Sequence, residues 1–409
     1  MSNGNDAIYF DHSATTKPLS EVVEVMNGFL QDAWGNPSSL YATGRRVRSA
    51  LEEARGRIAT ILGADAKEII FTGSGSESDN LAIKGVAESL AVKGNHIVTL
   101  SIEHPAVLET CHHLEKRGFE VTYVDPEPNG IASVQAIEQA ITDKTILVSV
   151  MMANNVIGTV QPIKEIAAMA HSKGVLVHTD AVQAAGTLPI DAGDLGVDLL
   201  SISAHKFHGP KGVGALYVRK GTRLKPLVDG GGQEQGKRSG TENVPGILGM
   251  AKALEIADAE MSEKMARMRN LRDKLVEGVL AFVPDSLFIG DSENRLPGSA
   301  CFTFRYVEGE SIVLHLDMMG IATSSGSACA SQALEPSHVL LRTGVSIVDA
   351  HGSLRVTLGR SSTGAEVDRF LEVLPGVINK LREMSPFSKG NEPSLVAEES
   401  SHGHGADTH

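Results

Sequence analysis

Short runs of β-forming residues alternate with longer segments of helical spacing between residue 50 and about residue 255. This alternation is typical of a parallel sheet whose strands are joined by crossover helices. Strands are expected at residues 69–72, 96–100, 120–124, 145–151, 175–178, 199–203 and 214–218. Helices are expected at residues 77–91, 105–117 and 162–172, the last with a proline in its first turn. The pattern predicts a doubly wound α/β fold with a mainly parallel seven-stranded sheet, whose ligands collect beyond the carboxyl ends of the strands.

The pattern changes after residue 255. A long charged helical segment at 256–282 is followed by strands near 299–305 and 354–358 and by a closing helix at 365–383. These elements predict a second, smaller α+β domain. We expect a large domain at 16–255 and a small domain that combines 1–15 with 256–384. Residues 385–409 have little apolar content and no periodicity, so they are expected to form a disordered tail. Its histidines either bind a metal weakly or have no role.

The charge balance of the 409 residues argues against polyanionic partners. Lys and Arg number 37 against 50 Asp and Glu, a formal net charge of −13, and aromatic residues make up 4 %. Such a surface repels phosphate backbones and anionic lipids and offers few rings for base stacking, so no nucleic-acid or membrane partner is expected. The first ten residues have neither a basic start nor an apolar core, which predicts a cytoplasmic protein.

The chain has three cysteines, Cys111, Cys301 and Cys329, with no CxxC spacing. This pattern argues against a disulfide framework and against a cysteine-rich metal site, so no metal is predicted. Cys111 and Cys301 lie among apolar residues of an expected helix and an expected strand, which favours structural roles. Cys329 lies in TSSGSACASQ, a run of small and hydroxylated residues that predicts a mobile loop. It is the candidate reactive thiol.

Polar residues follow two of the expected strands. Asp180 ends the apolar run VLVHTD, where an acid serves either as a helix cap or as part of a site. Ser203, His205 and Lys206 follow the strand at 199–203. A lysine at such a place is either a surface cation or an amine that forms a Schiff base with a carbonyl cofactor.

A Gly/Ser turn joins the first expected strand to the following helix in FTGSGSESDN, residues 71–80. Free backbone N–H groups at such a helix start bind phosphate. The segment matches neither GxGxxG nor a Walker loop. An acid, a lysine and a phosphate cradle are together the three requirements of pyridoxal phosphate.

Several segments resemble a known family. SISAHKFHGPKGVGALYV, VHTDAVQ and YFDHSATTKP are similar to the fold-type I pyridoxal-phosphate-dependent transferases of the class V aminotransferase group. Within that group the chain resembles cysteine desulfurases over residues 7–383. The segments that carry this second resemblance are GNPSSLYATGR (35–45), GGGQEQGKRSGTENVPGI (230–247), SSGSACASQALEPSHVL (324–340) and SLRVTLGRSSTGAEVD (353–368). The SSGSAC form is typical of the nitrogen-fixation and housekeeping iron–sulfur type, group I.

The resemblance implies roles for individual residues. Lys206 would form the Schiff base with pyridoxal 5'-phosphate and remove the α-proton of the substrate. Asp180 would pair with the pyridine nitrogen, and His104 would stack on the ring and relay a proton. Asn155 and Gln183 would lie beside the ring.

The phosphate and the substrate have their own implied ligands. Thr241 would reach the phosphate from a second subunit, which implies a homodimer with shared active sites. Arg355 would bind the substrate carboxylate, with Asn155 and Asn36 beside it, and Arg238 is a further candidate. The phosphate ligands within one chain would be Gly75, Ser76, Ser203 and His205.

The implied reaction converts L-cysteine to L-alanine and leaves the sulfur as a persulfide on Cys329. An iron–sulfur scaffold or another acceptor protein would then take the sulfur. Two alternatives stay open at this point. One is a related pyridoxal-phosphate-dependent lyase or transaminase, such as a selenocysteine lyase. The other is a non-catalytic assembly scaffold.

Overall fold

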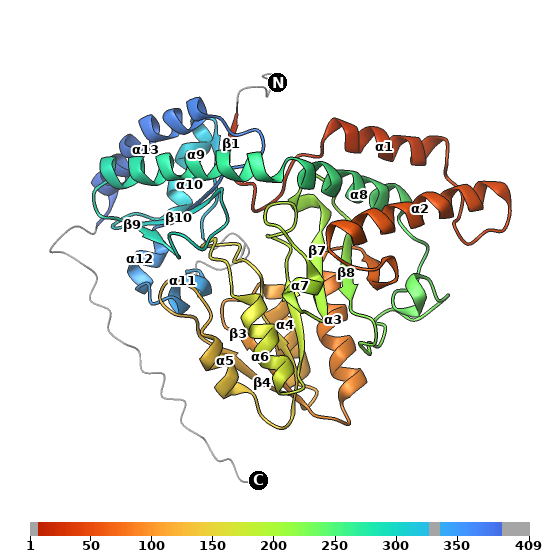
Figure 1. Cartoon of the computed structure of the whole chain (residues 1–409). Helices are drawn as coiled ribbons and strands as arrows, with labels where there is room; N and C mark the ends of the chain where they lie inside the picture. Colours follow the sequence, from red (N-terminus) through yellow and green to blue (C-terminus); the bar gives the residue numbers. More distant parts are fainter. Residues whose placement is uncertain (1–6, 327–335, 387–409) are drawn as a thin grey trace, which may run out of the picture.

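The computed structural model describes residues 7–326 and 336–386 (Figure 1). The predicted loop around Cys329 and the predicted tail from residue 387 onward lie outside the described residues.

The larger part of the chain is built on a seven-stranded sheet in the order β2-β8-β7-β6-β5-β3-β4. Strand β8 is antiparallel to both its neighbours, and the other paired strands are parallel. The predicted mainly parallel sheet is therefore confirmed. Its strands are β2 (Ile69–Thr72), β3 (His96–Leu100), β4 (Glu120–Val124), β5 (Thr145–Ser149), β6 (Leu176–Asp180), β7 (Leu199–Ser203) and β8 (Gly214–Val218).

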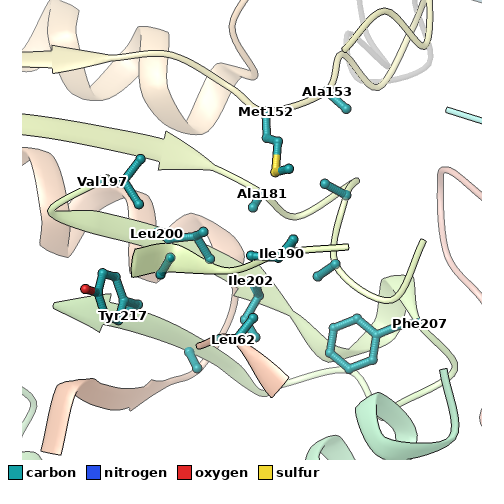
Figure 2. Packing of buried hydrophobic residues seen from close by; sticks show 14 of the residues in the cluster. Leu62, Met152, Ala153, Ala181, Ile190, Val197, Leu200, Ile202, Phe207 and Tyr217 are labelled. Atoms are coloured by element: carbon teal, nitrogen blue, oxygen red, sulfur yellow. The ribbon is translucent and has the colours of Figure 1, made fainter. Parts of the chain in front are cut away.

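Helices cover both faces of this sheet. On one face α3 (Gly75–Leu90) and α4 (Pro105–Glu115) form an apolar cluster with the strands. On the other face the cluster includes α2 (Ala42–Ile61), α6 (Ile163–Ser172) and α8 (Val244–Ala259). Figure 2 shows Leu200 and Ile202 of β7 packed in this second cluster near Leu62 and Phe207. The remaining elements of this part are α1 (Ser20–Gln31), α5 (Val134–Ala140), α7 (Ala192–Leu195) and the 3-10 turns η1 (Ala66–Glu68), η2 (Ala204–Lys206) and η3 (Glu234–Gly236).

The smaller part has a three-stranded antiparallel sheet in the order β12-β10-β9. A separate apolar cluster joins Phe10, near the N-terminus, to buried residues between 275 and 381. Figure 1 shows α9, α10 and α13 together at the end of the molecule where the N-terminus lies. The domain limits stay predictions. The elements are β1 (Ile8–Tyr9), α9 (Met261–Phe282), β9 (Ser286–Ile289), β10 (Ser299–Phe304), α10 (Gly309–Met318), β11 (Ile321–Ala322), α11 (His338–Arg342), α12 (Ile347–His351), β12 (Ser353–Thr357) and α13 (Gly364–Met384).

Several expected boundaries differ in the structure, among them those of the helices expected at 77–91 and 105–117, which are Gly75–Leu90 and Pro105–Glu115. The strand expected at 175–178 runs to Asp180, so this acid is the last residue of β6 and does not follow the strand. The strand expected at 145–151 ends at Ser149. The helix expected at 256–282 is divided between α8 and α9, because the chain leaves one helix after Ala259 and starts the next at Met261. None of the helices in the described residues is both long and apolar enough to cross a membrane.

Candidate active site

A cavity of about 320 Å³ lies at the carboxyl ends of the parallel strands. This is the position at which doubly wound sheets bind ligands. Most of the residues predicted to bind the cofactor or the substrate line it. They are Gly75, Ser76, His104, Asn155, Asp180, Gln183, Ser203, His205, Lys206 and Arg355.

Asp180 and Lys206 enter this cavity from neighbouring strands. Asp180 ends β6, is 6 % exposed, and accepts a hydrogen bond from the backbone N–H of Val182 at 2.9 Å. Burial raises the pKa of the Asp180 carboxyl, while His104 and Lys206 act to lower it. Lys206 lies in the turn η2 directly after β7. Its Nζ donates to the carbonyl oxygens of Ser13 and Ala14, the latter at 2.9 Å.

The start of α3 forms one wall of the cavity. Ser74 caps the helix, and its Oγ accepts from the backbone N–H of Glu77 at 3.1 Å. At Gly75 a Cβ atom would lie 2.7 Å from Val182 Cγ2, so only glycine lets the helix start approach the strand ends so closely. The first backbone N–H groups of a helix have no partner within it and attract anions. The donor set therefore fits a phosphate group.

His104 is held in one tautomer by its place at the start of α4. Its Nδ1 accepts a hydrogen bond from the backbone N–H of Ala106 at 3.1 Å, so the ring proton is assigned to Nε2. Burial lowers the pKa of His104, with Asp180 acting in the opposite direction. The imidazole is therefore neutral at pH 7 and presents an uncharged ring to the cavity.

Arg355 supplies the cation of the cavity wall opposite the sheet. It lies on β12 and is 3 % exposed. Its Nη1 donates to the carbonyl oxygen of Asn155 at 3.0 Å, and its Nη2 donates to Asp11 Oδ1 at 2.8 Å. Its Nε is buried without a hydrogen-bond partner, and each Nη atom keeps a second N–H. The remaining N–H groups of this buried cation fit a carboxylate of a bound molecule.

Among the described residues, three site candidates, Asn36, Thr241 and Arg238, do not line the cavity of the single chain. Asn36 is exposed, and its Oδ1 accepts from the backbone N–H of Ser38 at 2.8 Å. Thr241 is exposed in the segment before α8. Cys329 lies outside the described residues. Arg238 forms an ion pair with Glu77, in the first turn of α3, at 2.8 Å.

The other two cysteines are buried, free thiols. Cys111 lies on α4 and Cys301 on β10. Burial raises the pKa of each thiol to about 12, so neither supplies a thiolate at neutral pH. Within the described residues no cluster of His, Cys, Asp and Glu side chains forms a metal site.

Sequence reasoning missed three acids at this site, Asp11, Asp79 and Glu103. Asp79 lines the cavity, and Glu103 directly precedes His104. Both are buried, at 1 % and 0 % exposure. Asp79 follows Ser76 by three residues and Glu103 directly precedes His104, so proximity to predicted site residues was the signal for these two. Asp11 lies in YFDHSATTKP, a segment that carries the family resemblance.

The comparisons with known proteins give one consistent result. The family described as Aminotransferase class-V matches residues 8–370. A cysteine desulfurase IscS of Dictyoglomus turgidum is 52 % identical over 382 residues, which cover 93 % of this chain and 97 % of the relative. A cysteine desulfurase IscS of Clostridium botulinum strain Hall is 51 % identical over 385 residues, covering 94 % and 97 %. A solved structure described as a NifS-like protein has a TM-score of 0.87 and 40 % identity, covering 92 % of this chain and all of that one.

Proposed function

The chain belongs to the class V aminotransferase family and, within it, to the cysteine desulfurases, and on this premise we propose that it converts L-cysteine to L-alanine and supplies the sulfur to iron–sulfur cluster assembly. One observation carries the proposal. Lys206, Asp180 and the start of α3 meet in a single cavity whose far wall holds the unpartnered Nε of Arg355. Lys206 is suited to bind an aldehyde, Asp180 a ring nitrogen, the start of α3 a phosphate, and Arg355 the carboxylate of an amino acid.

Pyridoxal 5'-phosphate is the cofactor of this family, and the donor set of the cavity fits it. Lys206 would hold its aldehyde carbon, Asp180 its ring nitrogen, and Gly75, Ser76 and Ser203 its phosphate. When bound, the coenzyme supplies an electron sink for the charge released at the substrate α-carbon. Asp180 serves that sink best as an anion, and the Val182 N–H, His104 and Lys206 all favour the ionised carboxylate.

The chain's own groups then bind the substrate and move protons. Arg355 would bind the carboxylate of L-cysteine through the guanidinium N–H groups that do not bond Asn155 and Asp11. Lys206, once its amine leaves the carbonyl oxygens of Ser13 and Ala14, would take up the α-proton as a general base. His104 carries its proton on Nε2 and can exchange it with a group in the cavity.

Sulfur transfer to Cys329 balances as a simple exchange. The Cys329 thiolate attacks the substrate sulfur, the bond between that sulfur and the β-carbon breaks, and a sulfur–sulfur bond forms. Two protons complete the β-carbon of alanine and the persulfide, so a thiol and cysteine give a persulfide and alanine without any external oxidant. The raised pKa values of Cys111 and Cys301 support Cys329 as the acceptor.

We further propose a cytoplasmic homodimer in which Thr241 of each subunit reaches the phosphate in the other. The exposure of Thr241 and its absence from the cavity lining of its own chain support this assignment. An iron–sulfur scaffold or another sulfur acceptor protein would take the persulfide sulfur from Cys329.

The test is a product balance on the purified protein. L-cysteine is added to the coenzyme-loaded protein with a reductant, and alanine and sulfide are measured together. We expect equal amounts of the two products. Without the reductant, mass spectrometry should find one additional sulfur atom on the peptide that contains Cys329. Pyruvate and ammonia as the main products would contradict the proposal, because they indicate a lyase that eliminates sulfide without transfer to a thiol.

A further inference from the structure

Asp79 is a buried acid next to Asp180 for which the mechanism above has no role. It lies on α3, is 1 % exposed, and lines the cavity together with Asp180. The Ser201 hydroxyl acts to lower the pKa of its carboxyl, while its Oδ1 has no hydrogen-bond partner. A buried polar atom without a partner is costly, and far more so when the group is charged.

A hydrogen-bonded chain beside Asp79 crosses the middle of the sheet. Ser201 of β7 hydrogen-bonds His178 Nε2 at 3.0 Å, and His178 Nδ1 hydrogen-bonds Ser149 Oγ of β5 at 2.8 Å. His178 lies on β6, two residues before Asp180, and is fully buried. The Asp79 Oδ1 atom lies 3.6 Å from His178 Nε2. Asp79 therefore lies next to the chain that links β7, β6 and β5 behind Asp180.

Three buried carboxyl groups in this region, Asp79, Asp180 and Glu103, interact electrostatically. Glu103, from the segment before α4, accepts one hydrogen bond from the backbone N–H of Met151 at 2.7 Å, and its Oε2 has no partner. Burial raises the pKa values of Asp79 and Glu103 well above their usual range, and Asp180 raises both further. Like charges so placed cannot all ionise.

Asp180 is the member of the three with cationic support. Lys206 favours its charged form, as does the N–H of Val182. Asp79 has only the Ser201 hydroxyl, and the neighbouring His178 is itself kept neutral because burial lowers its pKa to about 3. Of the three carboxyl groups, Asp180 therefore carries the negative charge.

We propose that Asp79 is a positioning residue that remains a neutral carboxylic acid, anchors the Ser201–His178–Ser149 chain behind β6, and leaves Asp180 as the ionised partner of the coenzyme ring nitrogen. The inference rests on the proposed function, since it gives Asp180 its role toward pyridoxal phosphate. It adds a residue that touches neither coenzyme nor substrate in the mechanism.

The direct test is infrared difference spectroscopy at pH 8 on the protein with and without its coenzyme. The spectrum of wild type minus the spectrum of Asp79→Asn should show the C=O stretch of a protonated carboxylic acid, both with and without the coenzyme. The matched control is Asp258→Asn, which changes an exposed helical aspartate of α8 and should show a carboxylate difference only. A carboxylate difference for Asp79→Asn would overturn the proposal, because Asp79 would then be ionised and paired with a charged His178.

A second variant keeps the test decisive if Asp79→Asn does not fold. Ser201→Ala removes the hydroxyl that bonds Asp79, so it should shift the frequency of the carboxylic-acid band and keep the band itself. Disappearance of the band in Ser201→Ala would count against a neutral Asp79, since it would show that the hydroxyl decides the ionisation.

The positioning role has its own measurement in the holoenzyme. Asp79→Asn should bind pyridoxal phosphate within about threefold of wild type and keep the pH of the visible spectral transition, whereas Asp79→Ala should bind it about tenfold more weakly. Equal losses in both variants would overturn the role. Failure of wild type to bind the coenzyme would overturn the proposed function, while the infrared result on the coenzyme-free protein would still decide the protonation of Asp79.

Discussion

Arg355 Nη2 and Asp11 Oδ1 form an ion pair of 2.8 Å that joins the last strand of the small sheet to the N-terminal segment. The pair orients the guanidinium so that two of its donor groups are held within the protein, by Asp11 and by the carbonyl oxygen of Asn155. Its Nε is buried without a partner, and each Nη atom keeps a second N–H. The guanidinium is thus oriented before substrate arrives, with donors left for a carboxylate.

Replacing Arg355 by lysine should weaken substrate binding. A lysine side chain ends in a single ammonium group. It lacks the planar guanidinium that can contact Asn155, Asp11 and a carboxylate at the same time. We expect Arg355→Lys to raise the KM for L-cysteine by about tenfold to a hundredfold. Steady-state alanine formation measures this. The control is Arg117→Lys, in an exposed ion pair with Glu88. An unchanged KM would rule out Arg355 as the carboxylate ligand.

Replacing Lys206 by alanine should remove the covalent attachment of the coenzyme. In wild type, borohydride should fix pyridoxal phosphate to the peptide that contains Lys206, and Lys206→Ala should lose this label. Turnover should fall by about 10² to 10⁴, the usual range for a lost general base. Lys211→Ala, which changes an exposed lysine of the same segment, is the control. Label on any other lysine of the wild type would refute the assignment.

Cys329→Ala should separate coenzyme chemistry from sulfur transfer. The variant should keep the coenzyme absorbance and its change on addition of L-cysteine, because the cavity residues are intact. Sulfide production should be lost. Cys111→Ala should retain it, since that thiol is buried and its pKa is raised to about 12. Full sulfide production by Cys329→Ala would exclude the persulfide at this position.

His12 should make the protein less stable in acid. Burial and His208 lower the pKa of His12 to about 4, from 6.5, and neither ring nitrogen has a hydrogen-bond partner. Between those pH values the unfolded chain binds the proton that the folded chain excludes, so stability falls as pH falls from 6.5 to about 4. His12→Gln should flatten this fall by up to about 1.4 kcal/mol per pH unit. Urea denaturation at several pH values measures the difference, and identical slopes would contradict it.

Thr241→Ala should weaken coenzyme binding in the dimer by about tenfold, because it removes one hydroxyl donor to a charged phosphate. Dialysis against pyridoxal phosphate gives the affinity. Thr60→Ala, which changes an exposed helical threonine bonded to Gly56, is the control. A monomer by light scattering, with unchanged affinity in Thr241→Ala, would exclude a shared site.

The strands of the main sheet could be predicted because they are rich in β-forming residues, and all but the edge strand β4 are buried over nearly their whole length. Strand β9 could not, since its exposure alternates and its four residues include polar and apolar types. The positions of Lys206 and His104 followed from strand ends and from the family resemblance. Asp79 and Glu103 were not predicted, because an acid in a helical or loop pattern is ordinarily solvent-exposed. The burial of Asp79 and Glu103 depends on which elements pack over them. Only the tertiary structure shows that packing.

The contacts of the N-terminal segment also determine when the active site can form during synthesis of the chain. The Phe10 carbonyl oxygen accepts a hydrogen bond from the Thr357 backbone N–H, and the Ser13 backbone N–H donates to the Thr357 hydroxyl. The Ser13 carbonyl oxygen accepts a hydrogen bond from Lys206 Nζ. Phe10 and Ser13 therefore leave the ribosome 344 residues or more before the partner that they contact on β12. A nascent chain that ends before Thr357 has its lysine and its phosphate cradle but lacks the strand that closes the site, so activity should arise only after β12 has been synthesised.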